Sequence, residues 1–208
     1  MTNTLILDTS TERGVVALAA GSKLLLLKEL PMGLKSSHSL MTILQEVFQK
    51  YPMDLQAIAV TVGPGSFTGI RVAAAAAKGL ALARSLPLVA LSSLAGFISP
   101  HEGKFASVID ARVGGAYVLI QERVGDEIRE LGLPELCPKE ALPEKLRECL
   151  SVVGPSFQKL PTEGAIEIYP DAAHLAKIAA RRYVNGDFFP EGKLELTYLN
   201  NPAFRVAG

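Results

Sequence analysis

The chain has 208 residues, 49% of them hydrophobic, and its formal net charge is +0. This length and apolar content are enough for one large domain or two small ones with an ample core. A neutral chain is not expected to bind nucleic acid strongly by itself, because phosphate contacts need a basic surface. It can still work beside a subunit that binds nucleic acid.

Nothing in the sequence is typical of a membrane or secreted protein. Arg71, Lys78 and Arg84 interrupt the richest apolar stretch, so no run is long enough to span a bilayer. The N-terminus lacks the basic start, apolar core and cleavage site of a signal peptide. Cys137 and Cys149 have no histidine nearby and no metal-ligand spacing, so we expect ordinary thiols in a reducing compartment. We therefore expect a cytoplasmic protein.

The first half of the chain begins with three short apolar runs. Thr4–Asp8 is expected to be a buried strand, and Gly14–Ala20 and Leu24–Leu30 are expected to pair as a hairpin. The next segment is predicted to be a helix, because its apolar residues recur at helical spacing. These residues are Leu40, Ile43, Leu44, Val47, Phe48 and Tyr51. Pro52 ends this helix.

A strand, a glycine-rich loop, a long helix and a second strand follow. The apolar run Ala57–Val62 stops at the loop Gly63–Gly69, which reads GPGSFTG. An alanine-rich helix extends from the loop to about Arg84, and Leu88–Leu91 is the second strand. Ser66 or Thr68, both within the loop, can cap the helix.

The loop aims backbone amides outward, which is how proteins hold anions. It is not a P-loop, because no Gly-Lys-Ser/Thr follows at the required spacing. It is not the dinucleotide fingerprint either, because Thr68 stands where the third glycine belongs. It also lacks the glycine two residues after Ser66 that a hydrolase nucleophile elbow needs. On shape alone, a purely structural tight turn is an equal alternative.

The pattern begins again after the turn-like segment Pro100–Lys104. The expected elements are the strand Phe105–Asp110, a hairpin of Ala116–Glu122 and Glu127–Leu133, a helix at Pro143–Leu150, short strands at Ser151–Gly154 and Ala165–Tyr169, and a helix capped by Asp171. The order of strand ending in aspartate, hairpin, helix and strand thus occurs twice. We predict an α/β protein with a duplicated fold, in two βββαβα subdomains at residues 1–103 and 104–208, the second with an irregular tail. This is the architecture of the actin-like ATPase (ASKHA, RNase H-like) superfamily.

Several segments resemble the TsaB (YeaZ) family of that superfamily. The main one is GPGSFTGIR from Gly63, followed by AKGLALA and PLVALSSL. The segment Ile6–Thr11 is similar to the family's opening, and His38-Ser39 to the start of its first helix. Asp110-Ala111-Arg112, with Gly114 and Tyr117, is similar to the start of its second half. The resemblance is strong from Thr4 to about Tyr117 and weak afterwards, where Asn200 replaces the arginine of the family's closing Tyr-Leu-Arg motif.

The resemblance implies a non-catalytic subunit in tRNA threonylcarbamoyladenosine synthesis. The complex moves a threonylcarbamoyl group from its adenylate to the adenosine beside the anticodon of certain tRNAs. In this interpretation TsaD is the catalytic subunit, TsaE supplies ATP hydrolysis, and this chain binds and stabilises TsaD. The chain has no intrinsic cofactor, ATP or ADP is held where the subunits meet, and tRNA is contacted only through the complex. When alone, the chain is either a monomer or a homodimer. The alternatives are a free-standing ATP-dependent kinase or ATPase, and a metal-free peptidase for which no triad is evident.

Asp8 and His38 are the residues that an enzymatic function would use. Asp8 ends a strand where actin-like ATPases place a magnesium-organising carboxylate, but no glycine follows until Gly14 to let the backbone approach a phosphate. The alternative is that Asp8 accepts hydrogen bonds from nearby amides and hydroxyls; the case for Asp110 is weaker still. A helical metal pair would need a second histidine one turn after His38, where Thr42 stands. We therefore predict no metal site and no catalytic residue.

The helix after the loop has a composition that suits a partner helix. No acid occurs between Asp54 and Glu102. A stripe of Arg71, Lys78 and Ser85 runs along the helix, with Thr68, Ala75 and Leu82 close to it. Every other direction of the helix is apolar or glycine. A flat face of small side chains favours close approach of a partner, and a helix buried inside the domain is the alternative. The candidate partner-binding or nucleotide-proximal residues are Gly63, Pro64, Gly65, Ser66, Phe67, Thr68, Gly69, Arg71, Ala75, Lys78 and Leu82.

Overall fold

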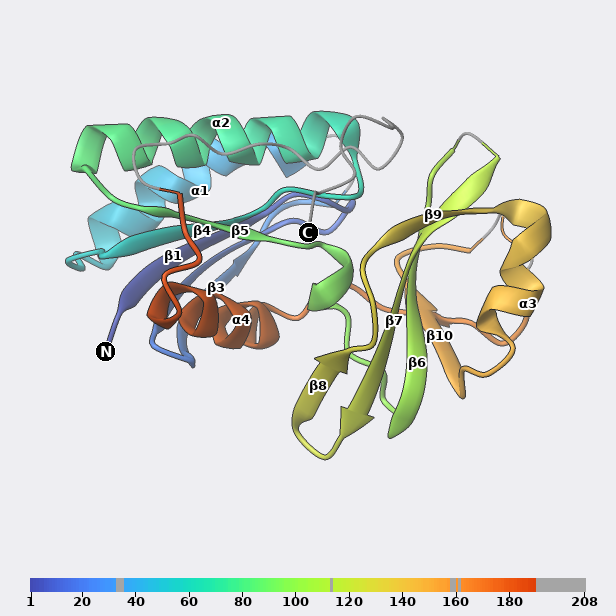
Figure 1. The fold of residues 1–208 in the computed structure, drawn as a ribbon. Coiled ribbons are helices and arrows are strands. Elements are labelled where there is room, and N and C mark those ends of the chain that lie inside the picture. The colour runs from blue at the N-terminus through green and yellow to red at the C-terminus, as the bar shows by residue number, and fades with distance from the viewer. Residues whose placement is uncertain (33–35, 113, 158–159, 161, 190–208) are drawn as a thin grey trace. The chain divides into compact units, whose positions relative to one another are not determined.

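The computed structural model describes residues 1–32, 36–112, 114–157, 160 and 162–189 (Figure 1). The chain folds into two compact units. The first unit contains Met1–Ser93 together with the described residues from Asp171 onward, and the second contains Leu94–Pro170.

The first unit is a five-stranded sheet with helices on both faces. The strand order is β3-β2-β1-β4-β5, in which β1, β2 and β3 are antiparallel neighbours and β1, β4 and β5 are parallel. The strands are β1 (Asn3–Asp8), β2 (Val15–Ala20), β3 (Lys23–Glu29), β4 (Ala57–Thr61) and β5 (Leu88–Leu91). Helices α1 (Ser36–Lys50) and α2 (Phe67–Arg84) lie on one face, and α4 (Ala172–Val184) lies on the other (Figure 1).

The core of the first unit lies mainly between the sheet and the pair α1 and α2. Buried leucine, isoleucine and valine side chains of β1, β2 and β4 meet the alanines of α2 and the apolar face of α1. Along β1, the side chains of Leu5 and Leu7 belong to this cluster while Ile6, also fully buried, points to the opposite face. Strands β1, β2, β4 and β5 are therefore largely buried on both faces and read as apolar runs, whereas the edge strand β3 alternates between exposed and half-buried side chains.

The second unit repeats this topology with shorter elements. Its sheet has the order β11-β10-β6-β7-β8, with β9 paired to β7, so β8-β7-β6-β10-β11 corresponds to β3-β2-β1-β4-β5. The strands are β6 (Gly103–Asp110), β7 (Gly115–Val124), β8 (Glu127–Glu130), β9 (Glu135–Pro138), β10 (Ser151–Gly154) and β11 (Ile166–Glu167). The helices are α3 (Leu142–Leu146) and the 3-10 turns η2 (Leu94–Gly96) and η3 (Lys139–Ala141). Its smaller core includes Cys137, and Cys149 packs against it; both are free thiols.

The repeated strand order confirms the predicted duplicated actin-like fold. The division of the chain differs from the expected 1–103 and 104–208, because it falls between Ser93 and Leu94 and returns α4 to the first unit. The physical reason is that α4 packs on β1, β3 and β5. In addition, the Arg182 Nη1 atom donates a hydrogen bond to the Ala90 carbonyl oxygen at 2.6 Å. The last helix of the second βββαβα repeat therefore packs on the sheet of the first unit. The expected irregular tail lies largely outside the described residues.

Candidate partner-binding site

The glycine-rich loop packs closely against the end of β1. Gly65 has φ +155°, and a Cβ atom there would lie 2.3 Å from the Ser10 carbonyl oxygen. A Cβ atom at Gly69 would lie 1.9 Å from the Thr9 carbonyl oxygen. Both glycines are therefore required by the chain's own backbone, since no side chain fits at these distances. The loop also contains a cis peptide bond between Gly63 and Pro64.

Hydrogen bonds fasten the same two segments together. The Ser66 amide donates to the Ser10 carbonyl oxygen at 2.7 Å, and the Thr9 hydroxyl donates to the Gly69 carbonyl oxygen at 2.6 Å. The Gly69 amide donates to Ser66 Oγ at 3.2 Å, so Ser66 is the N-cap of α2. Two of the loop amides that could hold an anion are thus bonded within the chain.

Asp8 is buried beneath this loop and hydrogen-bonded to its neighbours. Its Oδ1 atom accepts from the Ser10 amide at 2.8 Å and from the Thr61 hydroxyl at 2.7 Å. Its Oδ2 atom has no hydrogen-bond partner among the described residues. Burial raises the pKa of this carboxyl, against the lowering effect of these hydrogen bonds. The bonds made by Asp8 are those of the structural alternative considered from the sequence. Asp110, at the equivalent strand end of the second unit, accepts from the Arg112 amide at 2.7 Å.

One side of α2 packs on the sheet and the other side is exposed. The residues on the buried side are Gly69, Ile70, Ala73, Ala74, Ala77 and Ala81. Phe67 and Leu82 are 59% and 75% exposed, and Thr68, Arg71, Ala75 and Gly79 are exposed with them. Lys78 is half-buried, beside the exposed side. We call Phe67, Arg71, Ala75, Gly79 and Leu82 the α2 face.

The α2 face combines large apolar side chains with a small central segment. The Arg71 Cζ atom lies over the Phe67 ring, 3.6 Å from its centroid, so the guanidinium group stacks on the ring. A Cβ atom added at Gly79 would meet nothing within 4 Å. No contact within the described part of the chain therefore requires glycine at this position. Of the predicted stripe, the structure brings Thr68, Arg71, Ala75 and Leu82 together on the exposed side, and Gly79 was not among the candidates.

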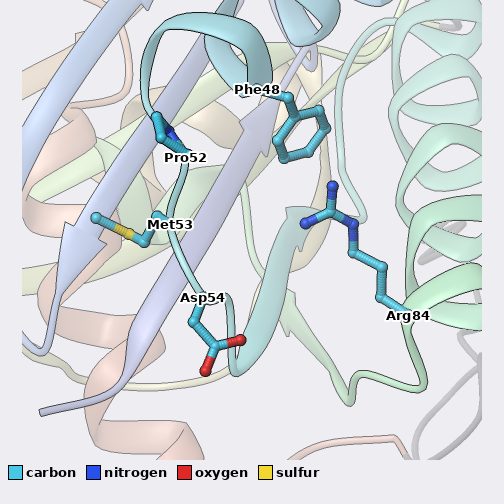
Figure 2. Close-up of a pocket in the computed structure, with 5 residues that line it drawn as sticks. All are labelled: Phe48, Pro52, Met53, Asp54 and Arg84. Carbon is cyan, nitrogen blue, oxygen red and sulfur yellow. The ribbon is translucent and has the colours of Figure 1, made fainter.

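A pocket of about 390 Å³ at the far ends of α1 and α2 was not predicted from the sequence. Phe48, Pro52, Met53, Asp54 and Arg84 line it (Figure 2). The Arg84 Cζ atom lies over the Phe48 ring at 4.5 Å from its centroid, and Asp54 brings a carboxylate to the same pocket. The local sequence gives little signal for it, because Phe48 and Arg84 are separated by 36 positions and meet only through packing of the two helices.

The described residues contain no group of three or more histidine, cysteine, aspartate or glutamate side chains that could hold a metal ion. His38 lies in the first turn of α1, and its side chain is outside the description. His101 is exposed, and the buried His174 donates its backbone amide to Asp171 Oδ1 at the start of α4. No helix in the described part of the chain has the length and apolar character needed to cross a membrane.

Comparison with known proteins gives the family. The model of the family TsaD, tRNA N6-adenosine threonylcarbamoyltransferase, matches residues 34–175. The tRNA threonylcarbamoyladenosine biosynthesis protein TsaB of Haemophilus influenzae (strain ATCC 51907 / DSM 11121 / KW20 / Rd) is 27% identical, over 95% of this chain and 93% of its own length. The chain belongs to the TsaB (YeaZ) branch of this family. TsaB of Escherichia coli (strain K12) is 28% identical, over 71% of this chain and 72% of its own.

The solved structure of YeaZ from Pseudomonas aeruginosa supports the same placement. It superposes on this TsaB-branch chain with a TM-score of 0.78 and 25% sequence identity. The match covers 96% of this chain and the whole of the other. Both units of the fold therefore belong to the TsaB branch, including the part after Tyr117 where the sequence motifs are weak.

Proposed function

We propose that this chain acts in tRNA threonylcarbamoyladenosine biosynthesis as a non-catalytic subunit that binds and stabilises the catalytic subunit TsaD through the α2 face. The observation that supports this most is the exposed apolar α2 face on a chain that aligns almost end to end with a protein named TsaB. A face with Phe67 and Leu82 exposed around Ala75 and Gly79 suits a partner helix that approaches closely.

The surroundings of Asp8 support a role without catalysis. The usual use of such a carboxylate is to organise a metal ion beside a phosphate held by loop amides. Here the Asp8 Oδ1 atom accepts hydrogen bonds from the Ser10 amide and the Thr61 hydroxyl. Gly69 packs directly against the backbone of Thr9 and accepts a hydrogen bond from its hydroxyl. In our proposal TsaD performs the chemistry and TsaE hydrolyses ATP, and any ATP or ADP is held where the subunits meet, near the loop Gly63–Gly69. Contact with tRNA is made through the complex, in the cytoplasm.

Leu82→Asp tests the proposed contact. Full burial of a leucine side chain stabilises a contact by about 1.5–3 kcal/mol. A carboxylate in the same packed position adds a desolvation cost of several kcal/mol. A loss of about 3 kcal/mol weakens binding on the order of a hundredfold. We expect this loss of affinity for purified TsaD, measured by calorimetry, with a melting temperature close to that of the unsubstituted chain because Leu82 is 75% exposed.

Leu133→Asp is the matched control. Leu133 is 80% exposed and lies in the second unit, away from α2 in the chain. The Leu133→Asp substitution should leave the affinity of the chain for TsaD unchanged. Equal affinity of the Leu82→Asp and Leu133→Asp variants for TsaD would place the contact elsewhere, and a large drop in melting temperature for Leu82→Asp alone would favour a structural role for α2.

A further inference from the structure

The pocket at the ends of α1 and α2 has walls that the chain itself holds in place. Phe48 and Met53 are half-buried and pack against the core of the first unit. The Asn3 Nδ2 atom donates a hydrogen bond to the Asp54 backbone carbonyl oxygen at 3.0 Å, and the Gln56 amide donates to the Asn3 carbonyl oxygen at 2.8 Å. These bonds fasten the segment after α1 to the start of β1. The pocket is therefore formed before any ligand enters, as small-molecule sites usually are.

Two opposite charges line this pocket without neutralising each other. Figure 2 shows Asp54 on one wall and Arg84 on the other. Within the described part of the chain, neither the Asp54 carboxylate nor the Arg84 guanidinium forms an ion pair or a hydrogen bond, and both side chains are exposed. Stacking on Phe48 places the Arg84 guanidinium, and its N–H groups stay available to a ligand. By contrast, Glu46 and Lys50 near the end of α1 pair with each other at 2.8 Å.

A ligand that satisfies both charges carries an anionic and a cationic group of its own. A phosphate or a simple carboxylic acid is attracted by Arg84 and repelled by Asp54, and a simple amine meets the reverse. A small zwitterion satisfies both walls, because guanidinium binds a carboxylate through two parallel hydrogen bonds and a carboxylate accepts from an ammonium group. Phe48 and Met53 add apolar surface to the same pocket.

We propose that this pocket binds a free α-amino acid with an apolar side chain. The carboxylate of the ligand lies at Arg84, its ammonium group at Asp54, and its side chain against Phe48, Pro52 and Met53. The volume of about 390 Å³ is within the range of small-molecule sites. Exposed ion pairs contribute little and the ligand is small, so we expect a dissociation constant on the order of 0.1–1 mM.

The amino-acid pocket is separate from the α2 face. None of the residues Phe67, Arg71, Ala75, Gly79 and Leu82 lines it. Amino-acid binding therefore does not depend on the proposed TsaD contact, and Leu82→Asp should leave it unchanged.

An amide NMR titration of the full chain with L-leucine as the probe tests the site. Saturable shifts should appear at Met53, Asp54 and Ser85, around the pocket, and not at Leu133 in the second unit. Two analogues remove one charge each: 4-methylpentanoate lacks the ammonium group, and 3-methylbutylamine lacks the carboxylate. Each should bind roughly fivefold more weakly than L-leucine, because it leaves one charged wall unpaired. Glycine, which lacks the apolar side chain, should bind roughly tenfold more weakly.

Substitution of the two charges should give a crossed pattern with these analogues. Arg84→Gln should weaken L-leucine and 4-methylpentanoate roughly fivefold and should not weaken 3-methylbutylamine. Asp54→Asn should weaken L-leucine and 3-methylbutylamine and should not weaken 4-methylpentanoate. Arg181→Gln on α4 and Asp126→Asn in the second unit are exposed, charge-matched controls and should leave all affinities unchanged. Both pocket residues are exposed, so thermal melting of their variants should be near that of the unsubstituted chain.

Three results would overturn the amino-acid site. The first is no saturable shift at L-leucine concentrations roughly tenfold above the expected dissociation constant. The second is 4-methylpentanoate binding as tightly as L-leucine, which would make the pocket a site for simple anions. The third is L-leucine binding that persists in both Arg84→Gln and Asp54→Asn, or that is lost equally in the Arg181→Gln control.

Discussion

Thr9 and Ser10, at the end of β1, set what the glycine-rich loop can do. The carbonyl oxygens of Thr9 and Ser10 lie too close to Gly69 and Gly65 to leave room for a Cβ atom at either position. Contacts within the chain therefore explain both glycines. The sequence predicts the loop, its helix cap and the buried Asp8, because each follows from local residue types. It does not predict that the loop closes on β1, because that contact joins segments more than fifty residues apart.

The buried carboxyl of Asp8 should make the fold less stable as pH rises. Burial raises its pKa in the folded chain above the ordinary value of 3.8. The folded state then holds the proton more tightly than the unfolded state, so the stabilising contribution is complete below about pH 3.8 and is lost as pH rises through the raised pKa. Asp8→Asn keeps the oxygen that accepts from Ser10 and Thr61 but cannot ionise.

Denaturant unfolding at a series of pH values measures this effect. The free energy of unfolding of Asp8→Asn, relative to that of the unsubstituted chain, should increase as pH rises above 3.8. Asp110→Asn is the control, because Asp110 is at the equivalent strand end but half-buried. A constant difference between Asp8→Asn and the unsubstituted chain at all pH values would show that Asp8 has an unshifted pKa.

At the scale of elements, one side of α2 packs on the sheet and the other side is exposed, so different physical constraints act on the two sides. Its buried side is mostly alanine, which lets the helix lie close to β4, β1 and β5. Gly79 lies on the exposed side, where glycine costs helix stability and no contact within the described chain needs it. A partner helix that packs closely against α2 at Gly79 would explain the glycine, because a side chain there would keep the two helices apart.

Substitutions at Gly79 should separate folding from partner binding. Gly79→Ala and Gly79→Leu should both raise the free energy of unfolding of the chain, by about 0.5–1 kcal/mol, because both residues form helices better than glycine. Gly79→Leu should also weaken TsaD binding roughly tenfold or more, because overpacking a close contact costs about 1–3 kcal/mol. Thermal melting and calorimetry on the same samples measure the two effects. Unchanged TsaD affinity for Gly79→Leu would place Gly79 outside the contact.

The elements that the sequence predicts well are those with a strong local pattern. The strands β1 to β7, apart from their end residues, and the helices α1, α2 and α4 follow from apolar periodicity and turn residues. Strand β9 was missed because Glu135–Pro138 has no alternation and is defined by its pairing with β7. Helix α3 ends at Leu146, four residues before the predicted end. Periodicity shows that α4 has an apolar face but not which sheet that face covers.

At the scale of the whole molecule, the proposed function predicts a loss of tRNA modification. Depleting this protein in its host should lower threonylcarbamoyladenosine in total tRNA, measured by mass spectrometry of digested tRNA. A plasmid copy of the unsubstituted chain should restore the modification, and a Leu82→Asp copy should restore it less well. An unchanged level after depletion, in a host with no substitute subunit, would contradict the assignment.

The return of α4 to the first sheet has a consequence for how the protein is made. The second unit is inserted in the chain between β5 and the helix that covers one face of β1, β3 and β5. On the ribosome, the first unit therefore cannot be completed until Val184 has emerged, although its five strands are finished at Leu91. During this interval Ile6 and its neighbours on that face stay open to solvent or to a chaperone. Truncation of the last quarter of the chain would consequently damage the unit that is synthesised first.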